Sequence, residues 1–390
     1  MKKYKLGDIC EIVSGSTPKT NITEFWDGDV KWITPAELDE NTYIITDSVR
    51  KITNLAMQKT GLTAFPAGTV ILSSRAPIGK VAIAGCKMCC NQGFKNFICS
   101  EIVNNKYLYW FLKHNTAYLN SLGRGATFKE ISKSIVSSIE IDLPSLEEQK
   151  RVVDNIEKIS TIITLRKKEI SILDDLIKAR FVEMFGDLAN PECKWNKYPL
   201  INACLNKDDI KCGPFGTQLS KDEYTAEGIA VWEIPQINMG FQCAPTHFLT
   251  EEKANQLEAY SLIPGDIAMS RKGNVGKCAL FPEEYSNGII HSDVLRIRVD
   301  KKNVNPVFMM YQLHFSKAVT RQIELVSSGA IMAGVNVTKL KQICVHIPPI
   351  ELQQKFADFV AQIDKSKATV QKALDETQLL FDSLMQQYFG

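Results

Sequence analysis

The sequence contains no apolar stretch long enough to cross a bilayer, because Lys, Asp or Glu interrupts every apolar run. Its first residues, Met1–Asp8, are basic, but the apolar segment of a signal peptide does not follow them. We therefore expect a cytoplasmic protein. With 390 residues, 45% of them hydrophobic and 23% charged, the chain is typical of a folded protein of about two domains.

An excess of one charge is also missing. The formal net charge is only +2, so composition alone does not indicate a nucleic-acid-binding protein. Any surface that binds DNA must then be a local basic patch, with the acidic residues placed elsewhere.

Metal ligands with a recognisable spacing are scarce. The eleven cysteines include one C-x-x-C pair, Cys86 and Cys89, with Cys90 beside it, but no second pair to complete a structural zinc site. Reduced thiols buried beside a strand are the favoured interpretation. The five histidines show no metal-ligand spacing, so we expect no metal site.

Catalytic motifs are equally scarce. The string Asn305–Phe308 lacks the second proline of an adenine methyltransferase motif, and no Gly-rich cofactor loop precedes it. The segment Gly273–Cys278 has two residues between its glycines, where a phosphate loop has four. We therefore predict that the chain is not an enzyme. An alternative is a pair of nucleotide-handling domains that use Lys80 and Lys277.

The chain contains an internal repeat. Gly68–Lys80 aligns with Gly265–Lys277 without a gap, at an offset of 197 residues. Leu143–Arg151 aligns with Ile347–Lys355 at an offset of 204, and at that offset Phe185-Gly186 falls on Phe389-Gly390. Two long copies of one unit are therefore expected.

Each copy consists of two parts that differ in composition. The first part has short apolar runs separated by Gly and Pro, which indicates strands, and helices are expected at 106–120 and 306–323. The second part lacks Pro and internal Gly, which favours one long helix of roughly 60 Å. We predict an α+β fold with these parts: domain 1 at 1–144, helix 1 at 145–186, domain 2 at 187–347 and helix 2 at 348–390.

The long helices carry apolar residues every seven positions, as in a coiled coil. An antiparallel coiled coil is predicted, and a pair of ordinary core helices is the alternative. The expected contact positions are Ile156, Ile159, Ile163, Arg166, Ile170, Leu173, Ile177, Arg180 and Met184 in the first helix, and Phe356, Phe359, Ile363, Val370, Ala373, Leu380 and Leu384 in the second.

In its order of motifs the chain resembles the specificity subunit of type I restriction-modification enzymes. The resemblance covers nearly the whole chain and depends on the duplication more than on any one motif. Its first copy is carried by Trp32–Pro35, Ser74–Lys80, Gly123–Thr127, Leu143–Gln149 and Met184–Asp187, and its second by Trp232–Pro235, Ser270–Gly273, Ser328–Ala330 and Ile347–Gln353.

The resemblance implies a mechanism. Domains 1 and 2 would be target recognition domains, each reading one half of a split, asymmetric DNA target, and the paired helices would set the spacer. The helices would also dock two modification subunits, which would bind S-adenosylmethionine and methylate adenine N6, with restriction subunits joining indirectly. The chain itself would need no cofactor. Alternatives are a coiled-coil adaptor that ignores DNA, or a specificity subunit of another methylation-based defence system.

Basic, Gly-flanked turns are the candidate DNA contacts, because Arg, Asn and Gln read base edges while Lys, Ser and Thr bind phosphate. The candidates are Ser16, Thr17, Lys19, Ser74, Arg75, Lys80, Arg124, Thr217, Gln218, Arg271, Lys272, Asn274 and Lys277. Trp26, Trp32 and Trp232 could stack on bases, but their bulk favours a place in the core.

Overall fold

The computed structural model describes residues 2–75, 77–125, 129–190, 192–285, 287–327 and 334–390. The chain forms two compact units. Unit 1 comprises Met1–Lys168 and Gln371–Gly390, and unit 2 comprises Glu169–Val370. No helix of the described segments is long and apolar enough to cross a membrane.

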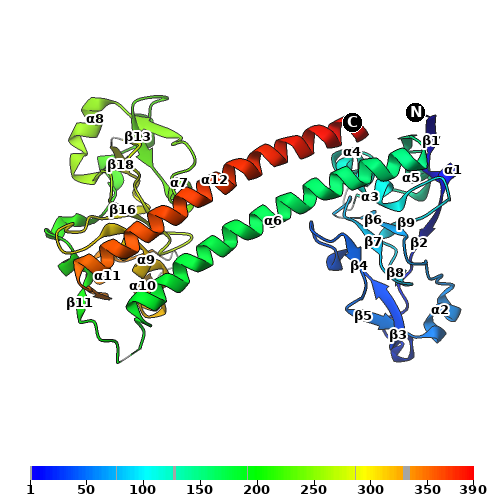
Figure 1. Ribbon diagram of the computed structural model, residues 1–390, viewed down its shortest axis with the longest axis horizontal. Coiled ribbons are helices and arrows are strands. Elements are labelled where there is room, and N and C mark those ends of the chain that lie inside the picture. The colour runs from blue at the N-terminus through cyan, green and yellow to red at the C-terminus, as the bar shows by residue number, and fades with distance from the viewer. Residues whose placement is uncertain (1, 76, 126–128, 191, 286, 328–333) are drawn as a thin grey trace. The chain divides into compact units, whose positions relative to one another are not determined.

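Unit 1 is built on a five-stranded sheet whose central strands are buried (Figure 1). Its strands, in pairing order, are β2 (Cys10–Ser14), β9 (Phe94–Cys99), β6 (Val70–Ser73), β7 (Val81–Ala84) and β4 (Ile44–Ile45). A second sheet contains β5 (Arg50–Ile52), β3 (Trp26–Ile33) and β8 (Cys89–Cys90). A short pair, β1 (Lys2–Lys5) with β10 (Glu140–Leu143), leads into the long helix.

Unit 2 repeats this arrangement. Its first sheet contains β12 (Ile210–Cys212), β19 (Val294–Ile297), β16 (Ile267–Ser270) and β17 (Cys278–Leu280), in the order of their counterparts in unit 1. Its second sheet contains β14 (His247–Leu249), β13 (Ile229–Trp232), β18 (Gly288–Ile290) and β15 (Ser261–Leu262), and its short pair is β11 (Lys197–Pro199) with β20 (Cys344–His346). The expected internal repeat and α+β fold are confirmed.

Shorter helices fill the connections between the strands. In unit 1 they are α1 (Leu6–Ile9), α2 (Asn54–Thr60), α3 (Asn105–His114), α4 (Thr116–Ser121) and α5 (Lys133–Ser137). In unit 2 they are α7 (Ile234–Asn238), α8 (Glu251–Gln256), α9 (Pro306–Phe315), α10 (Lys317–Ser327) and α11 (Val337–Leu340). The helices expected at 106–120 and 306–323 are therefore each broken, at Asn115 and at Ser316, whose backbone angles leave the helical range.

The turn between β6 and β7 is reproduced between β16 and β17. Ser73 donates its N–H to the Lys80 oxygen at 2.8 Å, and Ser270 donates to the Lys277 oxygen at the same distance. In both turns a glycine with positive φ, Gly79 or Gly276, precedes the lysine. Each glycine lies under a helix: a Cβ on Gly276 would stand 2.9 Å from Ile323.

The long helices are α6 (Leu146–Phe185) and α12 (Ile350–Phe389), and they run antiparallel to each other within each unit. In unit 1, Arg166 of α6 donates to the Ala373 oxygen, while Ile156 shares a core with Met385 and Phe389. In unit 2, Asp174 pairs with Lys367 at 2.6 Å. The coiled coil predicted from the heptads is confirmed.

One contact position was wrong. Leu380 is 52% exposed, whereas the next residue, Phe381, turns inward and lies 5.8 Å from the Trp110 ring of α3. The heptad pattern places residues against another helix. Here the last turns of α12 pack on α3 as well as on α6, which favours a different face of α12.

A buried glutamine fixes the start of each long helix. Gln149 accepts the Asn104 N–H at 2.8 Å and donates to the Ile102 and Pro144 oxygens at 2.9 and 3.0 Å. Gln353 makes the same three contacts with Asn305, Asn303 and Pro348. Asn104 and Asn305 cap α3 and α9. The glutamine that closes each Pro-led segment, Pro144–Gln149 or Pro348–Gln353, therefore ties a long helix to a recognition domain.

The aromatic end of each long helix packs on the same short helices. The ring of Phe389 lies 5.0 Å from Tyr107 of α3, and the ring of Phe185 lies 4.6 Å from Phe308 of α9. Each recognition domain is therefore held by the beginning of one long helix and the end of the other.

We expect Gln149→Leu to lower the free energy of unfolding by about 2–4 kcal/mol, because the buried amide is lost and one backbone N–H and two backbone oxygens lose their partner. Gln353→Leu should lower the free energy of unfolding by a similar amount. The measurement is urea unfolding. Gln371→Leu, on the exposed face of α12, serves as the matched control and should change stability by less than about 0.5 kcal/mol. Equal stability of the Gln149 and Gln371 variants would contradict the assignment.

Candidate nucleic-acid interface

The predicted basic turns of unit 1 meet on one edge, here called the first rim: residues 15–19, 74–75, 77, 91–93, 124–125 and 129–131. The Ser16 N–H donates to the Cys90 oxygen at 3.1 Å, and the Ser74 N–H donates to the Gly93 oxygen at 2.7 Å. Ser74 accepts in turn from the Ile131 N–H at 3.0 Å. Four segments far apart in the sequence are thus joined through backbone hydrogen bonds.

A carboxylate lies at the centre of the first rim. Glu130 accepts from Arg75 Nε at 2.9 Å and pairs with Lys95 Nζ at 3.3 Å. The Lys95 side chain is only 7% exposed and also donates to Ser74 Oγ. Burial raises the pKa of the Glu130 carboxyl, but the Arg75 hydrogen bond and the Lys95 charge outweigh it and hold that pKa below its ordinary value.

The remaining candidates of the first rim differ in how they are held. Lys19 and Arg124 are exposed, and the backbone of Arg124 pairs with that of Glu130. Thr17 donates its hydroxyl to Gln92 at 2.5 Å. Lys80 points elsewhere: its Nζ donates to the Pro35 and Leu38 oxygens at 3.0 and 2.5 Å, so it supports that segment.

Unit 2 has a matching edge, here called the second rim: residues 213–218, 270–274, 291–293 and 334–335. The Gly213 N–H donates to the Val294 oxygen at 3.1 Å. The Arg271 N–H donates to the Asp293 oxygen at 2.9 Å, and Arg271 accepts from the Val335 N–H at 3.1 Å. Ser74 of unit 1 makes the equivalent two backbone hydrogen bonds, so Arg271 is its counterpart in unit 2.

The side chains of the second rim again combine cations with a carboxylate. Lys272 pairs with Asp293 at 2.8 Å, and Asp293 lies beside His291. The Arg271 guanidinium lies 4.7 Å from the centre of the Phe215 ring. Each rim therefore holds its basic turn against an acidic side chain, although Glu130 and Asp293 come from different loops.

The other candidates of unit 2 lie around this rim. Thr217 and Asn274 are exposed. Gln218 is engaged by the protein, since its Oε1 accepts from the Phe215 N–H and from the Tyr260 hydroxyl, both at 3.1 Å. Lys277 lies beside His314 of α9. Burial of the His314 ring, and then the Lys277 charge, lower the pKa of that histidine.

The tryptophans and the C-x-x-C cysteines were expected in the core, and some motif residues lie outside the part of the chain that the structure describes. Trp26, Trp32 and Trp232 are buried, as expected for core residues. Cys89 and Cys90 are buried in strand β8, and burial raises their pKa values to about 11 and 12. Among the motif residues of the resemblance, Ala76, Ala126, Thr127 and Ser328–Ala330 lie outside the described residues.

Sequence reasoning missed the residues that contact the candidate residues or their neighbours at the two rims: Gln92, Lys95, Glu130, Phe215, His291 and Asp293. A usable signal existed for some of them. Asn91–Gly93 precedes β9, which pairs with β6, and His291–Asp293 precedes β19, which pairs with β16. The repeat could therefore have placed both segments beside the basic turns that follow β6 and β16.

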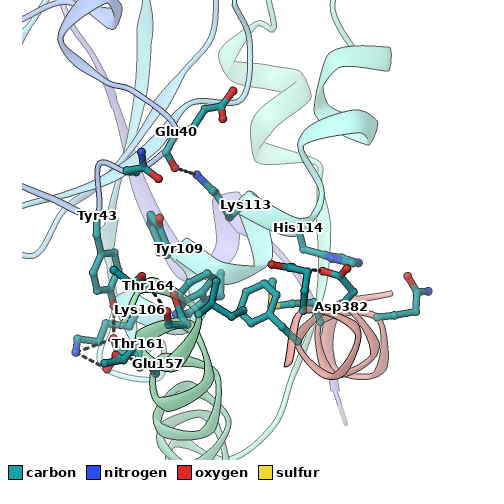
Figure 2. Close-up of a pocket in the computed structure, with 18 residues that line it drawn as sticks. Glu40, Tyr43, Lys106, Tyr109, Lys113, His114, Glu157, Thr161, Thr164 and Asp382 are labelled. Atoms are coloured by element: carbon teal, nitrogen blue, oxygen red, sulfur yellow. Dashed lines mark hydrogen bonds and ion pairs between the residues drawn. The ribbon is translucent and has the colours of Figure 1, made fainter. Parts of the chain in front are cut away.

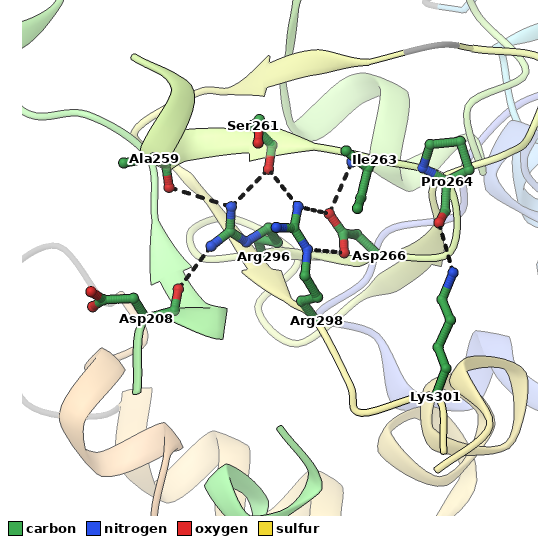
Figure 3. A network of polar contacts seen from close by, with 9 residues as sticks. All are labelled: Asp208, Ala259, Ser261, Ile263, Pro264, Asp266, Arg296, Arg298 and Lys301. Atoms are coloured by element: carbon green, nitrogen blue, oxygen red, sulfur yellow. Dashed lines mark hydrogen bonds and ion pairs between the residues drawn. The ribbon is translucent and has the colours of Figure 1, made fainter. Parts of the chain in front are cut away.

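Two further arginines of unit 2 serve the fold (Figure 3). Arg296 is buried and donates to the backbone oxygens of Ser261 and Asp208, both at 2.8 Å, and of Ala259 at 3.3 Å. Arg298 holds Asp266 through two hydrogen bonds of 2.8 and 2.7 Å. Burial lowers the pKa of Arg296. These side chains tie loops of both sheets together and lie outside the second rim.

Unit 1 also holds a cavity of about 940 Å³ where α3 meets the two long helices (Figure 2). The Tyr43 hydroxyl donates to Glu157, which also pairs with Lys106 at 2.9 Å. Lys113 donates to the Glu40 oxygen at 2.7 Å. Unit 2 has a cavity of about 450 Å³ between α6 and α9, in the corresponding place.

Two segments of the chain, residues 1–174 and 212–377, match the type I restriction modification DNA specificity domain. They comprise most of both units. The chain therefore belongs to the family of type I restriction-modification specificity subunits and carries two copies of its domain.

Known relatives agree with this assignment. The chain is 41% identical over 186 residues to the type I restriction enzyme MjaIX specificity subunit of Methanocaldococcus jannaschii. These aligned residues make up 47% of this chain and only 43% of that relative. It is 20% identical over 386 residues to the MjaVIII specificity subunit of the same organism, covering 95% and 89%. The crystal structure of the S subunit from M. genitalium has the same fold, with a TM-score of 0.59, 15% identity and coverage of 100% and 96%.

We expect Glu130→Gln to lower stability by about 1 kcal/mol at neutral pH, a modest loss because solvent reaches the carboxylate. A carboxyl whose pKa is lowered by folding stabilises the protein above its unfolded pKa, and the effect disappears as the pH falls through the folded pKa. The difference between wild type and variant should therefore shrink below about pH 4. Urea unfolding across this range tests it.

The control for this prediction is Glu140→Gln, which neutralises an exposed carboxylate of β10. A Glu130→Gln deficit that stays the same from neutral to acid pH would show that the carboxylate charge is not its cause.

Proposed function

We propose that this chain is the DNA-reading subunit of a type I restriction-modification complex. Each rim binds one half of a split, asymmetric target, so the two units together define the sequence that the complex recognises. The chain chooses the site and performs no bond-breaking step itself.

The observation that carries this proposal is the duplicated rim. In each unit a basic turn between paired strands is brought beside an early Gly-led loop and the loop before the next strand. Arginine and lysine side chains on such loops suit guanine edges and phosphates. Gly15 and Gly213 each lie against the backbone just before β9 or β19, so Phe215, two residues on, corresponds to Thr17, as Arg271 corresponds to Ser74. Because these side chains differ, the two half-sites are expected to differ.

The long helices supply the surface for the modification subunits in this proposal. Apolar side chains remain exposed on both helices: Ile162, Leu165, Ile172, Leu176 and Val182 on α6, and Leu379 and Leu380 on α12. Exposed apolar side chains of this kind mark protein interfaces, and the cavities beside α3 and α9 add a matching hollow in each unit. Two modification subunits would bind there, carry S-adenosylmethionine and methylate adenine N6, and restriction subunits would join through them.

The first test maps N6-methyladenine across a genome by single-molecule sequencing, in cells that express the modification subunit with or without this chain. A split motif with a fixed spacer should appear only when the chain is present. If methylation is the same in both strains while the modification subunit is active, the chain does not choose sites, and the coiled-coil adaptor becomes the better explanation.

We expect Arg271→Ala to weaken binding to the specific duplex by about 1–3 kcal/mol. Arg271 is held on the second rim by the bond from its Nε to the Val335 oxygen and by its contact with the Phe215 ring. Binding is measured at fixed salt, since phosphate contacts depend on ionic strength. Arg321→Ala removes an exposed arginine of α10 outside the rim and is the matched control. Equal affinities of the two variants would remove Arg271 from the interface.

A further inference from the structure

Phe215 is an apolar side chain in an unusual place. Its exposed fraction is 46%, and every other phenylalanine among the described residues is buried or partly buried. It stands on the second rim, among Arg271, Lys272 and Asp293, where polar side chains would be expected. A large ring left in water within a charged edge points to a partner that covers it.

The backbone holds Phe215 in this position. Gly213 lies so close to the loop before β19 that a Cβ would stand 2.3 Å from the His291 oxygen. The Phe215 N–H donates to Gln218 Oε1, and the Tyr260 hydroxyl fixes the same oxygen, both at 3.1 Å. The loop is therefore preorganised, and little ordering remains to be done when a ligand binds.

Arg271 covers one face of the ring. Its guanidinium carbon lies 4.7 Å from the ring centre, within the range of a cation–π contact. Arg271 Nε donates to the Val335 oxygen at 3.2 Å, and Nη1 lies 3.5 Å from the Ser292 oxygen. These contacts orient the guanidinium, while Nη2 has no hydrogen-bond partner in the described part of the chain.

We infer that Phe215 and Arg271 read two neighbouring base pairs as one element, a thymine followed by a guanine. The free part of the Phe215 ring contacts the C5-methyl group of the thymine, and Arg271 donates to guanine O6 and N7. The inference rests on the proposed function and adds to it a specificity residue that is not basic. The corresponding residue of unit 1, Thr17, has no aromatic ring, so we expect this element in only one of the two half-sites.

The experiment uses the complex of the full chain with its modification subunits and a duplex carrying the mapped motif. Each thymine of the motif is replaced in turn by uracil, which removes only the methyl group. One replacement, beside a guanine, should weaken wild-type binding about fourfold, the effect of one buried methyl group. Phe215→Ala should bind more weakly overall and should bind the thymine and uracil duplexes equally.

Two variants complete the test. Phe215→Leu keeps an apolar side chain and should retain part of the discrimination. Tyr198→Ala removes another exposed ring of unit 2, 36% exposed in β11, and should keep the full fourfold effect. If no uracil replacement affects the wild type, or if Phe215→Ala still discriminates, the inference is wrong while DNA reading stands. If no duplex is bound specifically, the proposed function itself fails.

Discussion

The buried amide of a glutamine at the start of each long helix is the contact on which the architecture depends. One side chain makes hydrogen bonds to three backbone groups, at the point where a strand, a helix cap and a 40-residue helix meet. Since Gln149 and Gln353 do this identically, the direction in which each long helix leaves its own recognition domain is set by the same geometry. The aromatic ends of the helices, Phe185 and Phe389, then meet surfaces already positioned by that amide.

The rims show how a chain with almost no net charge can still present basic edges. Arg75, Lys95 and Lys272 are held against Glu130 or Asp293, so their charges are partly neutralised in the free protein. To bind these cations, a phosphate or a base edge would have to replace the carboxylates as their partners. Random duplex gains little from such an exchange, whereas a matching sequence adds base contacts to it, so paired charges favour discrimination over raw affinity.

The sequence predicted what depends on short-range pattern. The repeat, the α+β class, the coiled coil and the burial of three tryptophans follow from periodicity and residue type, and they hold. Leu380 was misplaced because heptads describe a helix against another helix, whereas α12 also packs on α3. The partners of the basic turns could not be read in the same way. Glu130 lies 55 residues from Arg75 in the sequence, and only the sheet pairing brings them together. Lys80, identical in type to a phosphate-binding residue, serves backbone oxygens of its own unit.

The discontinuity of unit 1 has a consequence for biosynthesis. Unit 2 is one continuous segment, Glu169–Val370, whereas the core of unit 1 includes Met385 and Phe389. A chain growing from its N-terminus therefore makes the first recognition domain early but supplies the helix that covers α3 only after all of unit 2 has been synthesised. Until then Tyr107, Trp110 and Phe111 of α3 lack their contacts with Phe381 and Phe389 of α12. The unit that is translated first is thus the one whose core is completed last, and apolar surface left uncovered during that interval is prone to aggregation.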